Sequence, residues 1–159
     1  MLITLVYILY VVATPHAPHL ISTVNLIFHE AGHTLMPFFG ALVQAAAGSG
    51  LQVVVPLACA ISFWKRGDLY SVGIVLMWAG ESIAEVARYA GDAVAMQLDL
   101  LGGDDVIHDW NFILETLGAL QWTPYISYGL YALAFAIIVY GAALSLRESV
   151  TVCETVDVV

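Results

Sequence analysis

The residues best suited to chemistry are two histidines and a glutamate in the segment Phe28–His33, which reads Phe-His-Glu-Ala-Gly-His. If residues 20–36 form a helix, His29 and His33 lie four residues apart on one face, and Glu30 lies about 100° around the axis. Neutral imidazoles bind zinc, and a neighbouring glutamate can take a proton from a metal-bound water molecule. The pattern therefore predicts a zinc site with His29 and His33 as ligands and Glu30 as the catalytic base.

H-E-x-x-H has only three fixed positions and can match a sequence by chance, so the residues around the motif help to decide whether it is a real site. Most of its neighbours are apolar, and burying three polar groups without partners costs free energy. The alternative to a metal site is a pair of histidines that make hydrogen bonds in a polar seam between helices.

A catalytic zinc site needs a third protein ligand and an open position for water. The later part of the chain offers Glu85, Asp92, His108 and Asp109. We predict that Asp92 or His108 is the third ligand and that Asp109 orients an imidazole. Gln52 is either a donor to a reacting carbonyl group or a hydrogen-bond partner between helices.

The composition indicates an integral membrane protein. The mean hydropathy is +0.89, 61% of the 159 residues are hydrophobic and 11% are charged, whereas about a quarter of residues are charged in soluble domains. About 20 residues cross the roughly 30 Å hydrocarbon core of a bilayer. We therefore expect one all-α membrane domain over residues 1–146, a bundle of about four to six helices with some short or kinked. A short acidic tail, residues 147–159, would follow it.

The charge and the cysteines narrow the range of partners. A formal net charge of −9 argues against binding to nucleic acid and supplies no polybasic patch for anionic lipid. Cys59 lies in an apolar run and Cys153 in the tail, so neither a disulfide framework nor a cysteine zinc site is suggested. The expected partners are the lipid bilayer and a membrane-protein or peptide substrate, and an oligomer or a larger complex is compatible with the sequence.

The N-terminal apolar run, Leu2–Ala13, has no basic segment before it and no small-residue cleavage site, so we expect a retained first membrane helix. It is short for a full crossing. Two prolines then break the chain in residues 14–19. His16 and His19 in this loop are either further metal ligands or solvated side chains.

Residues 20–47 are expected to form the helix that carries the motif, bent after Pro37 and Gly40. The sequence Gly-Ser-Gly at residues 48–50 predicts a turn, after which residues 51–64 return as another apolar segment.

The basic residues suggest an orientation. Lys65 and Arg66 form the main basic cluster, and Arg147 follows the last apolar run. By the tendency of basic loops to remain in the cytoplasm, we expect a bacterial inner-membrane protein whose Lys65/Arg66 loop and C-terminus are cytoplasmic.

Residues 69–98 are predicted to form a helix with an ionisable face. Glu81, Glu85, Arg88 and Asp92 recur at spacings of four, three and four. Such residues in a membrane helix usually face the bundle interior and pair, so we expect Arg88 to pair with Glu85 or Asp92. The alternative is an amphipathic helix end whose charges are solvated.

Residues 99–109 read as a polar turn, with Gly102, Gly103, Asp104 and Asp105 favouring it. His108 and Asp109 then lead into an apolar stretch that ends near Leu120. His108 is either a metal ligand with Asp109 as its partner or a histidine at the start of a helix.

The charge-free run from residue 122 to residue 146 is long enough to cross the bilayer. Tyr125, Tyr128 and Tyr131 form a stripe that favours interfacial anchoring and helix packing.

The motif helix resembles that of the intramembrane zinc metalloproteases of the site-2 protease type, in His29, Glu30 and His33 only. The Asn-Pro-Asp-Gly-type segment that carries the third ligand in that family is missing here. A broader resemblance, over residues 20–120, is to small uncharacterised bacterial membrane proteins that combine an H-E-A-G-H helix with a later Tyr-x-x-Asp-Ala and a His-Asp-Trp. The matching residues are His29–His33, Tyr89, Asp92, Ala93 and His108–Trp110.

Two functions follow as hypotheses. The first is a zinc metalloprotease-like membrane hydrolase, which acts on a peptide through Glu30. The second is a non-enzymatic membrane protein with a structural metal or an ion- or proton-conducting polar core, as a small subunit of a larger complex.

Overall fold

The computed structural model describes residues 1–17, 19–101 and 106–156, and these residues are almost entirely helical. The described part contains six α-helices and two 3-10 helices and no strand, which confirms the predicted all-α bundle. In chain order the elements are α1 (Leu2–Ala13), α2 (Leu20–Leu35), η1 (Pro37–Phe39), α3 (Ala41–Lys65), α4 (Leu69–Gly91), α5 (Asp109–Thr116), η2 (Leu120–Trp122) and α6 (Thr123–Val156).

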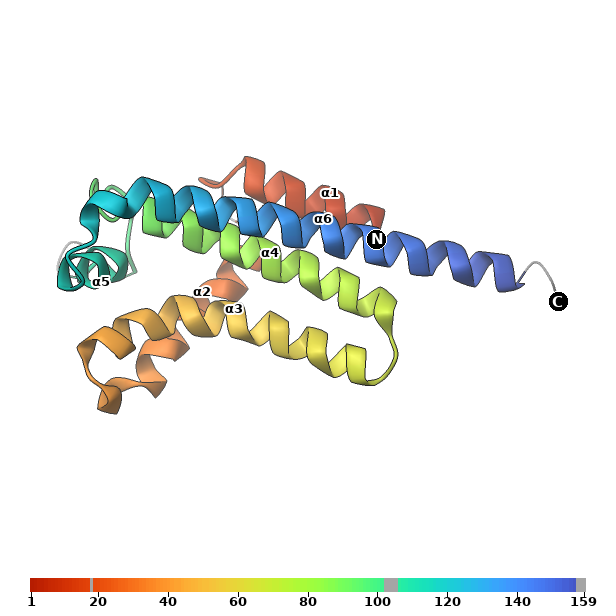
Figure 1. The fold of residues 1–159 in the computed structure, drawn as a ribbon, viewed down its shortest axis with the longest axis horizontal. Coiled ribbons are helices and arrows are strands. Elements are labelled where there is room, and N and C mark those ends of the chain that lie inside the picture. The colour runs from red at the N-terminus through yellow and green to blue at the C-terminus, as the bar shows by residue number, and fades with distance from the viewer. Residues whose placement is uncertain (18, 102–105, 157–159) are drawn as a thin grey trace.

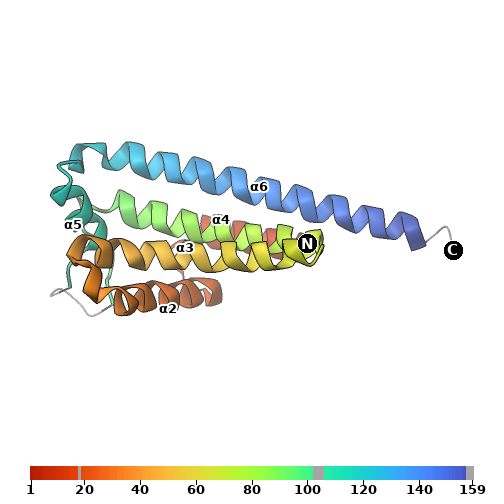
Figure 2. The ribbon, with the colours of Figure 1, turned by 60° about the horizontal axis from the view of Figure 1, so that its bottom comes forward.

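The longest helices, α3, α4 and α6, form the body of the molecule (Figure 1). Each is long and apolar enough to cross a membrane. α4 is central, because it packs along α6 and also contacts α3 and α1. The turn between α3 and α4, the N-terminus and the C-terminal end of α6 lie at one end of the bundle, and α5 lies at the other (Figures 1 and 2).

The contact between α4 and α6 depends on small residues. A Cβ atom added at Gly141 of α6 would lie 2.6 Å from the carbonyl oxygen of Gly73 of α4, and one added at Gly80 would lie 2.5 Å from the Ile138 side chain. In lipid, such close backbone approach gives packing energy that larger side chains would prevent.

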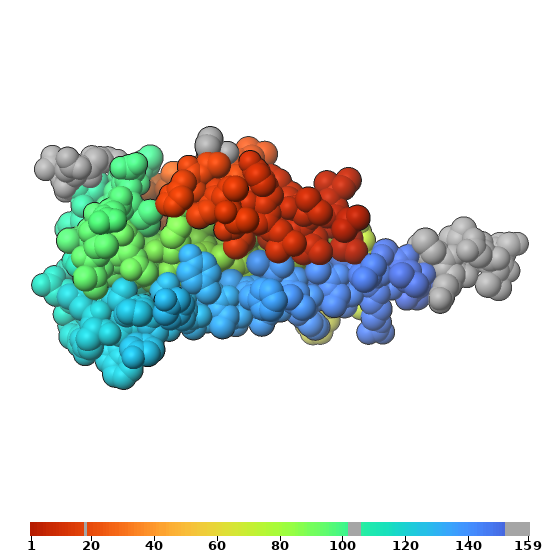
Figure 3. All heavy atoms as spheres, turned by 90° about the horizontal axis from the view of Figure 1, so that it is seen from above, coloured from red at the N-terminus to blue at the C-terminus, as the bar shows by residue number. Residues whose placement is uncertain are grey.

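Figure 3 shows α1 lying over α4 and beside α6. Ile8 of α1, Met77 of α4 and Ile138 of α6 form a buried apolar cluster at this junction. α1 and α2 both run away from the N-terminal end of the bundle, and the break between them carries the chain to the far side of α4 (Figure 2). His19, at this break, is buried: its Nε2 lies 2.9 Å from the Thr14 carbonyl oxygen, whereas His16 is exposed. Neither His16 nor His19 belongs to the group of residues around His29 and His33 that could hold a metal.

The predicted bent helix over residues 20–47 and the predicted turn at residues 48–50 are both wrong. α2 ends at Leu35, and the chain reverses through η1 and Gly40, which has a φ of 89°. Proline begins the 3-10 turn without needing an N–H partner, and only glycine adopts such a φ readily. Gly48 and Gly50 lie inside α3, where Gly48 faces α2.

Two further helix ends differ from the prediction. α4 ends at Gly91 instead of residue 98, because Asp92 caps it and its carboxylate accepts the N–H groups of Gln97 and Leu98. α6 continues to Val156, so the first ten residues of the predicted tail are helical. The turn predicted at Gly102–Asp105 and the side chain of Cys153 lie outside the described residues.

Candidate metal centre

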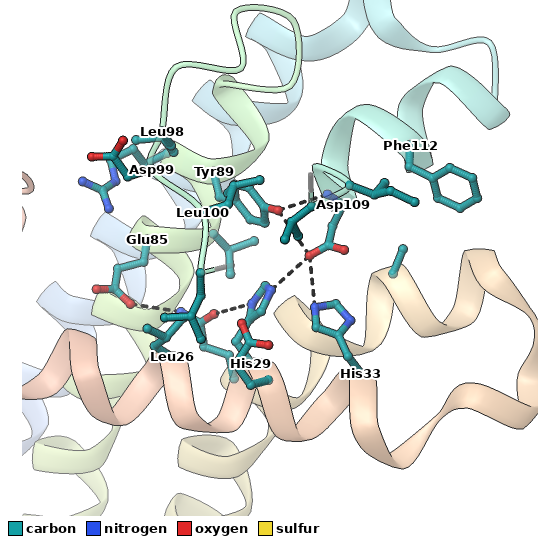
Figure 4. A pocket seen from close by; sticks show the side chains of 18 of the residues that line it. Leu26, His29, His33, Glu85, Tyr89, Leu98, Asp99, Leu100, Asp109 and Phe112 are labelled. Atoms are coloured by element: carbon teal, nitrogen blue, oxygen red, sulfur yellow. Dashed lines mark hydrogen bonds and ion pairs between the residues drawn. The ribbon is translucent and has the colours of Figure 1, made fainter. Parts of the chain in front are cut away.

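The two motif histidines and one aspartate meet at a single point (Figure 4). The Nε2 atoms of His29 and His33 lie 3.0 and 3.1 Å from the same carboxylate oxygen of Asp109, Oδ2. One ligand atom from each of the three residues lies within 4.8 Å of the others. α2 places the imidazoles one turn apart on one face, and Asp109 reaches them as the first residue of α5.

The remaining nitrogen of each imidazole is held by α3. His29 Nδ1 lies 3.2 Å from the side-chain oxygen of Gln52, and His33 Nδ1 lies 2.8 Å from the backbone oxygen of Gln44. Both partners can only accept, so each Nδ1 carries a hydrogen and donates it. A neutral imidazole then presents the lone pair of its Nε2, which is the form that binds a metal.

Gly48 gives the imidazoles room to turn toward Asp109. A Cβ atom added at Gly48 would lie 2.5 Å from His33 Nε2 and 2.7 Å from His29 Nε2. Gly32 of α2 makes a matching approach, since a Cβ there would collide with the backbone of Ala47. Sequence reasoning assigned Gly48 to a turn and missed this role. The signal that was present is the spacing of Gln44, Gly48 and Gln52, which places all three on one face of a helix.

Tyr89 of α4 holds Asp109 in position. Its hydroxyl donates to Asp109 Oδ2 at 3.3 Å and accepts the backbone N–H of Asp109 at 3.0 Å. This is the helix-to-helix link that fixes the start of α5 above the histidines.

The predicted third ligands, Asp92 and His108, lie outside the group of three. His108 caps α5, because its Nδ1 accepts the backbone N–H of Asn111, and its ring packs on Tyr89 with a centroid separation of 4.4 Å. Its Nε2 points to Asp92 Oδ2 at 3.4 Å. The capping geometry thus turns His108 away from the other histidines, and the structure brings Asp109 to them instead.

The three residues open onto a cavity of about 720 Å³. Glu30 lines this cavity beside His29 and is half-buried, and its carboxylate has no hydrogen-bond or ion-pair partner among the described residues. The cavity is also lined by three further polar side chains, those of Gln52, Glu85 and Arg88. The rest is largely apolar, with Leu26 and Phe112 on opposite sides of the opening (Figure 4).

The donor set fits a divalent metal ion. Two imidazole lone pairs and a carboxylate oxygen repel one another unless a cation lies between them. Tetrahedral ligands about 2.0–2.1 Å from zinc lie roughly 3.3 Å apart, close to the two distances of 3.0 and 3.1 Å observed. Without a metal, a shared proton is the other cation that could fill this role.

The fold and this group define an all-helical bundle with three helices that could span a membrane and a His/His/Asp group that could bind a metal. Comparisons with protein-family models, with curated proteins and with solved structures find no match to this chain.

Proposed function

We propose that this protein is a membrane metallohydrolase that binds zinc through His29, His33 and Asp109. The observation that carries the proposal is the orientation of the two imidazoles: both donate Nδ1–H to oxygen atoms of α3 and aim Nε2 at one carboxylate oxygen. Three protein ligands leave one position free, which is the arrangement of catalytic zinc sites.

Glu30 is the general base of this proposal. Zinc, when bound, acts as a Lewis acid and lowers the pKa of water. The free carboxylate of Glu30, which lines the same cavity, takes the proton from the attacking water and passes it to the leaving group. Tyr89 keeps Asp109 in place, and Gln52 orients His29 rather than contacting substrate.

The substrate that the cavity suits best is an amide bond in an extended, largely apolar segment, such as a membrane-embedded peptide. The cavity is large enough for several side chains, and its walls combine leucine, valine and phenylalanine side chains with the polar group at its base.

Titration of the purified protein with zinc in detergent, which gives both the stoichiometry and the affinity, tests the ligand set. The wild type is expected to bind one zinc ion per chain. Asp109→Asn should weaken zinc binding by at least about 10-fold, because losing a residue that binds the metal costs more affinity than losing one that only orients a ligand. Asp92→Asn is the matched control, since it changes the residue predicted from sequence, and it should retain one zinc ion. Equal affinity in wild type and Asp109→Asn would overturn the proposed centre.

Glu30→Gln tests turnover. It should retain zinc and lose cleavage of quenched-fluorescence peptides that carry an apolar membrane-spanning sequence. Cleavage at the wild-type rate by zinc-loaded Glu30→Gln would exclude Glu30 as the base.

A structural metal site without turnover is the second candidate. It is favoured by the way both imidazoles are held, with each Nδ1 donating to an oxygen atom of α3 and each Nε2 facing Asp109 of α5, since a metal bound there would hold the bundle end together. Cobalt substitution separates the two functions: acetohydroxamic acid should change the visible spectrum of an open site and leave that of a closed site unchanged.

A further inference from the structure

A second polar cluster lies deeper in the bundle, beside the metal centre but separate from it. Glu81 of α4 has 0% of its surface exposed, and its Oε1 is buried without a hydrogen-bond partner. An unpaired buried carboxylate is costly in a membrane helix, so this position requires an explanation.

Asn25 of α2 joins Glu81 to Glu85. Its side-chain nitrogen donates to Glu81 Oε2 at 2.8 Å and to Glu85 Oε2 at 2.7 Å. Its own oxygen accepts the indole N–H of Trp78 at 2.8 Å, which fixes the orientation of the amide. Asn25 is itself 0% exposed.

Glu85 accepts a further hydrogen bond from the side-chain nitrogen of Gln52 at 3.0 Å. Both amides therefore turn N–H groups, and not oxygen atoms, toward the carboxyl groups. Metal cations of the hard type need oxygen ligands, so this environment does not suit one. It suits carboxyl groups that hold a proton between them.

Arg88 lies near the pair but forms no ion pair with Glu81 or Glu85 in the described part of the chain. The predicted ion pair of Arg88 with Glu85 or Asp92 is wrong: among the described residues neither carboxylate lies within 4.0 Å of the guanidinium group, which donates instead to the backbone oxygen of Pro15. Arg88 is drawn to this oxygen because the broken segment between α1 and α2 leaves carbonyl groups without helical partners.

The two carboxyl groups connect two cavities. Glu81 lines a small cavity of about 30 Å³ between α1, α2, α4 and α6, and Glu85 lines both this cavity and the larger one at the metal centre. A cavity of this size holds about two water molecules by the usual measure of 10–15 Å³ each. The small cavity thus has room for water beside Glu81, and the larger one has room for water beside Glu85.

We propose that Glu81 and Glu85 share one exchangeable proton and form a proton-transfer site between the two cavities. In the transfer step, the O–H bond of the Glu81 carboxylic acid breaks and an O–H bond forms on the Glu85 carboxylate. Glu81 becomes the carboxylate, and the pair carries a single negative charge before and after the step. Asn25 donates to both carboxyl groups throughout and keeps them adjacent.

The titratable groups around the pair come from four helices and from the segment before α5. Arg88 and Tyr131 line the small cavity, and Arg88 also lines the larger one. The other titratable groups line the larger cavity only: Glu30, His29 and His33 of α2, Tyr89 of α4, Asp99, and Asp109 of α5. The lining residues of α1, Val11 and Val12, and the lining residues of α3 carry no titratable group.

Infrared spectroscopy of the full chain in lipid bilayers tests the proposal. The wild type at pH 7 should show the C=O band of a carboxylic acid that shifts when the medium is changed to D₂O. Glu81→Gln should abolish the band, because it removes the fully buried carboxyl group that holds the proton before the transfer. Glu85→Gln should keep a shifted band that exchanges with D₂O severalfold more slowly, because Glu81 then loses its route to the larger cavity.

Glu115→Gln, an exposed change on α5, is the matched control and should leave the band unaltered. Absence of a carboxylic-acid band in the wild type at pH 7 would overturn the proposal. This measurement uses the wild-type protein alone, so it does not depend on whether a variant folds. A band unchanged in Glu81→Gln would overturn it as well. The result is independent of the metal centre, since zinc stoichiometry is measured on the same samples and Glu81→Gln should retain one zinc ion.

Discussion

Asp109 and Gly48 show how single residues complete the candidate centre. Asp109 supplies the carboxylate that faces both imidazoles, and Gly48 leaves the space into which the imidazoles turn. The two residues lie on different helices from the histidines, α5 and α3. The centre is thus a junction of three helices, although its most recognisable residues belong to one.

Gly48→Ala tests this arrangement at the residue scale. The added methyl group would lie 2.5 Å from His33 Nε2, so we expect zinc affinity to fall by 10-fold or more, that is, by about 1.4 kcal/mol. The backbone should remain helical because alanine has a higher helix propensity than glycine, by about 1 kcal/mol. Zinc titration of the folded protein measures the change.

Gly50→Ala is the control for that substitution. It lies two residues further along α3, and an added Cβ there meets no atom within 4 Å. It should gain the same helix propensity and bind zinc as tightly as wild type. If both variants bind zinc equally well, the proposed role of Gly48 is wrong.

At the scale of elements, the contact between α4 and α6 is expected to dominate the stability of the bundle. Gly141→Leu would push a side chain into the backbone of Gly73. Overpacking of this kind costs about 1–3 kcal/mol. The free energy of unfolding in detergent should fall by that amount, as measured by circular dichroism during denaturant titration.

Gly129→Leu, on the same helix, provides the comparison. Gly129 is exposed, and a Cβ added there meets nothing within 4 Å. This variant should unfold with a free energy close to that of wild type. A loss of stability as large as that of Gly141→Leu would contradict the proposed role of the contact with α4, because leucine has a higher helix propensity than glycine and should not itself destabilise the helix.

At the scale of the whole molecule, the basic turn at Lys65 and Arg66 and the metal centre lie at opposite ends. Lys65 and Arg66 join α3 to α4 at the end that holds the N-terminus, whereas α5, which carries Asp109, lies at the other end (Figure 1). If basic loops remain in the cytoplasm, the candidate centre lies near the outer face of the membrane.

Cysteine accessibility checks this orientation. In a chain without its native cysteines, Gly118→Cys near α5 should react with a membrane-impermeant maleimide added to intact bacterial cells, and Gly67→Cys in the basic turn should react only after lysis. Both glycines have open space around them, so the new side chain meets no neighbouring atom, and both have a positive φ (63° and 77°) that strains a cysteine in either variant. The reverse pattern would invert the proposed topology.

Sequence alone determined the properties that depend on local periodicity and composition. The apolar composition predicts helices that could span a membrane, because a helix satisfies its backbone hydrogen bonds within itself. The spacing of His29 and His33 places both imidazoles on one face of α2 wherever that helix lies. The ends of helices were less predictable, as α4 shows. The spacing of Asp92 from the preceding ionisable residues predicted that the helix would continue, but Asp92 caps the helix and ends it.

Tertiary structure decided which residues complete the group. Asp109 is 80 residues from His29 in sequence, and its selection over Asp92 and His108 depends on where α4 ends, how α5 is capped and where Tyr89 holds its first residue. Gly48 and Asn25 acquired their roles in the same way, from the approach of α3 and α4 to α2. Local spacing sets the face of a helix, but only packing sets what that face meets.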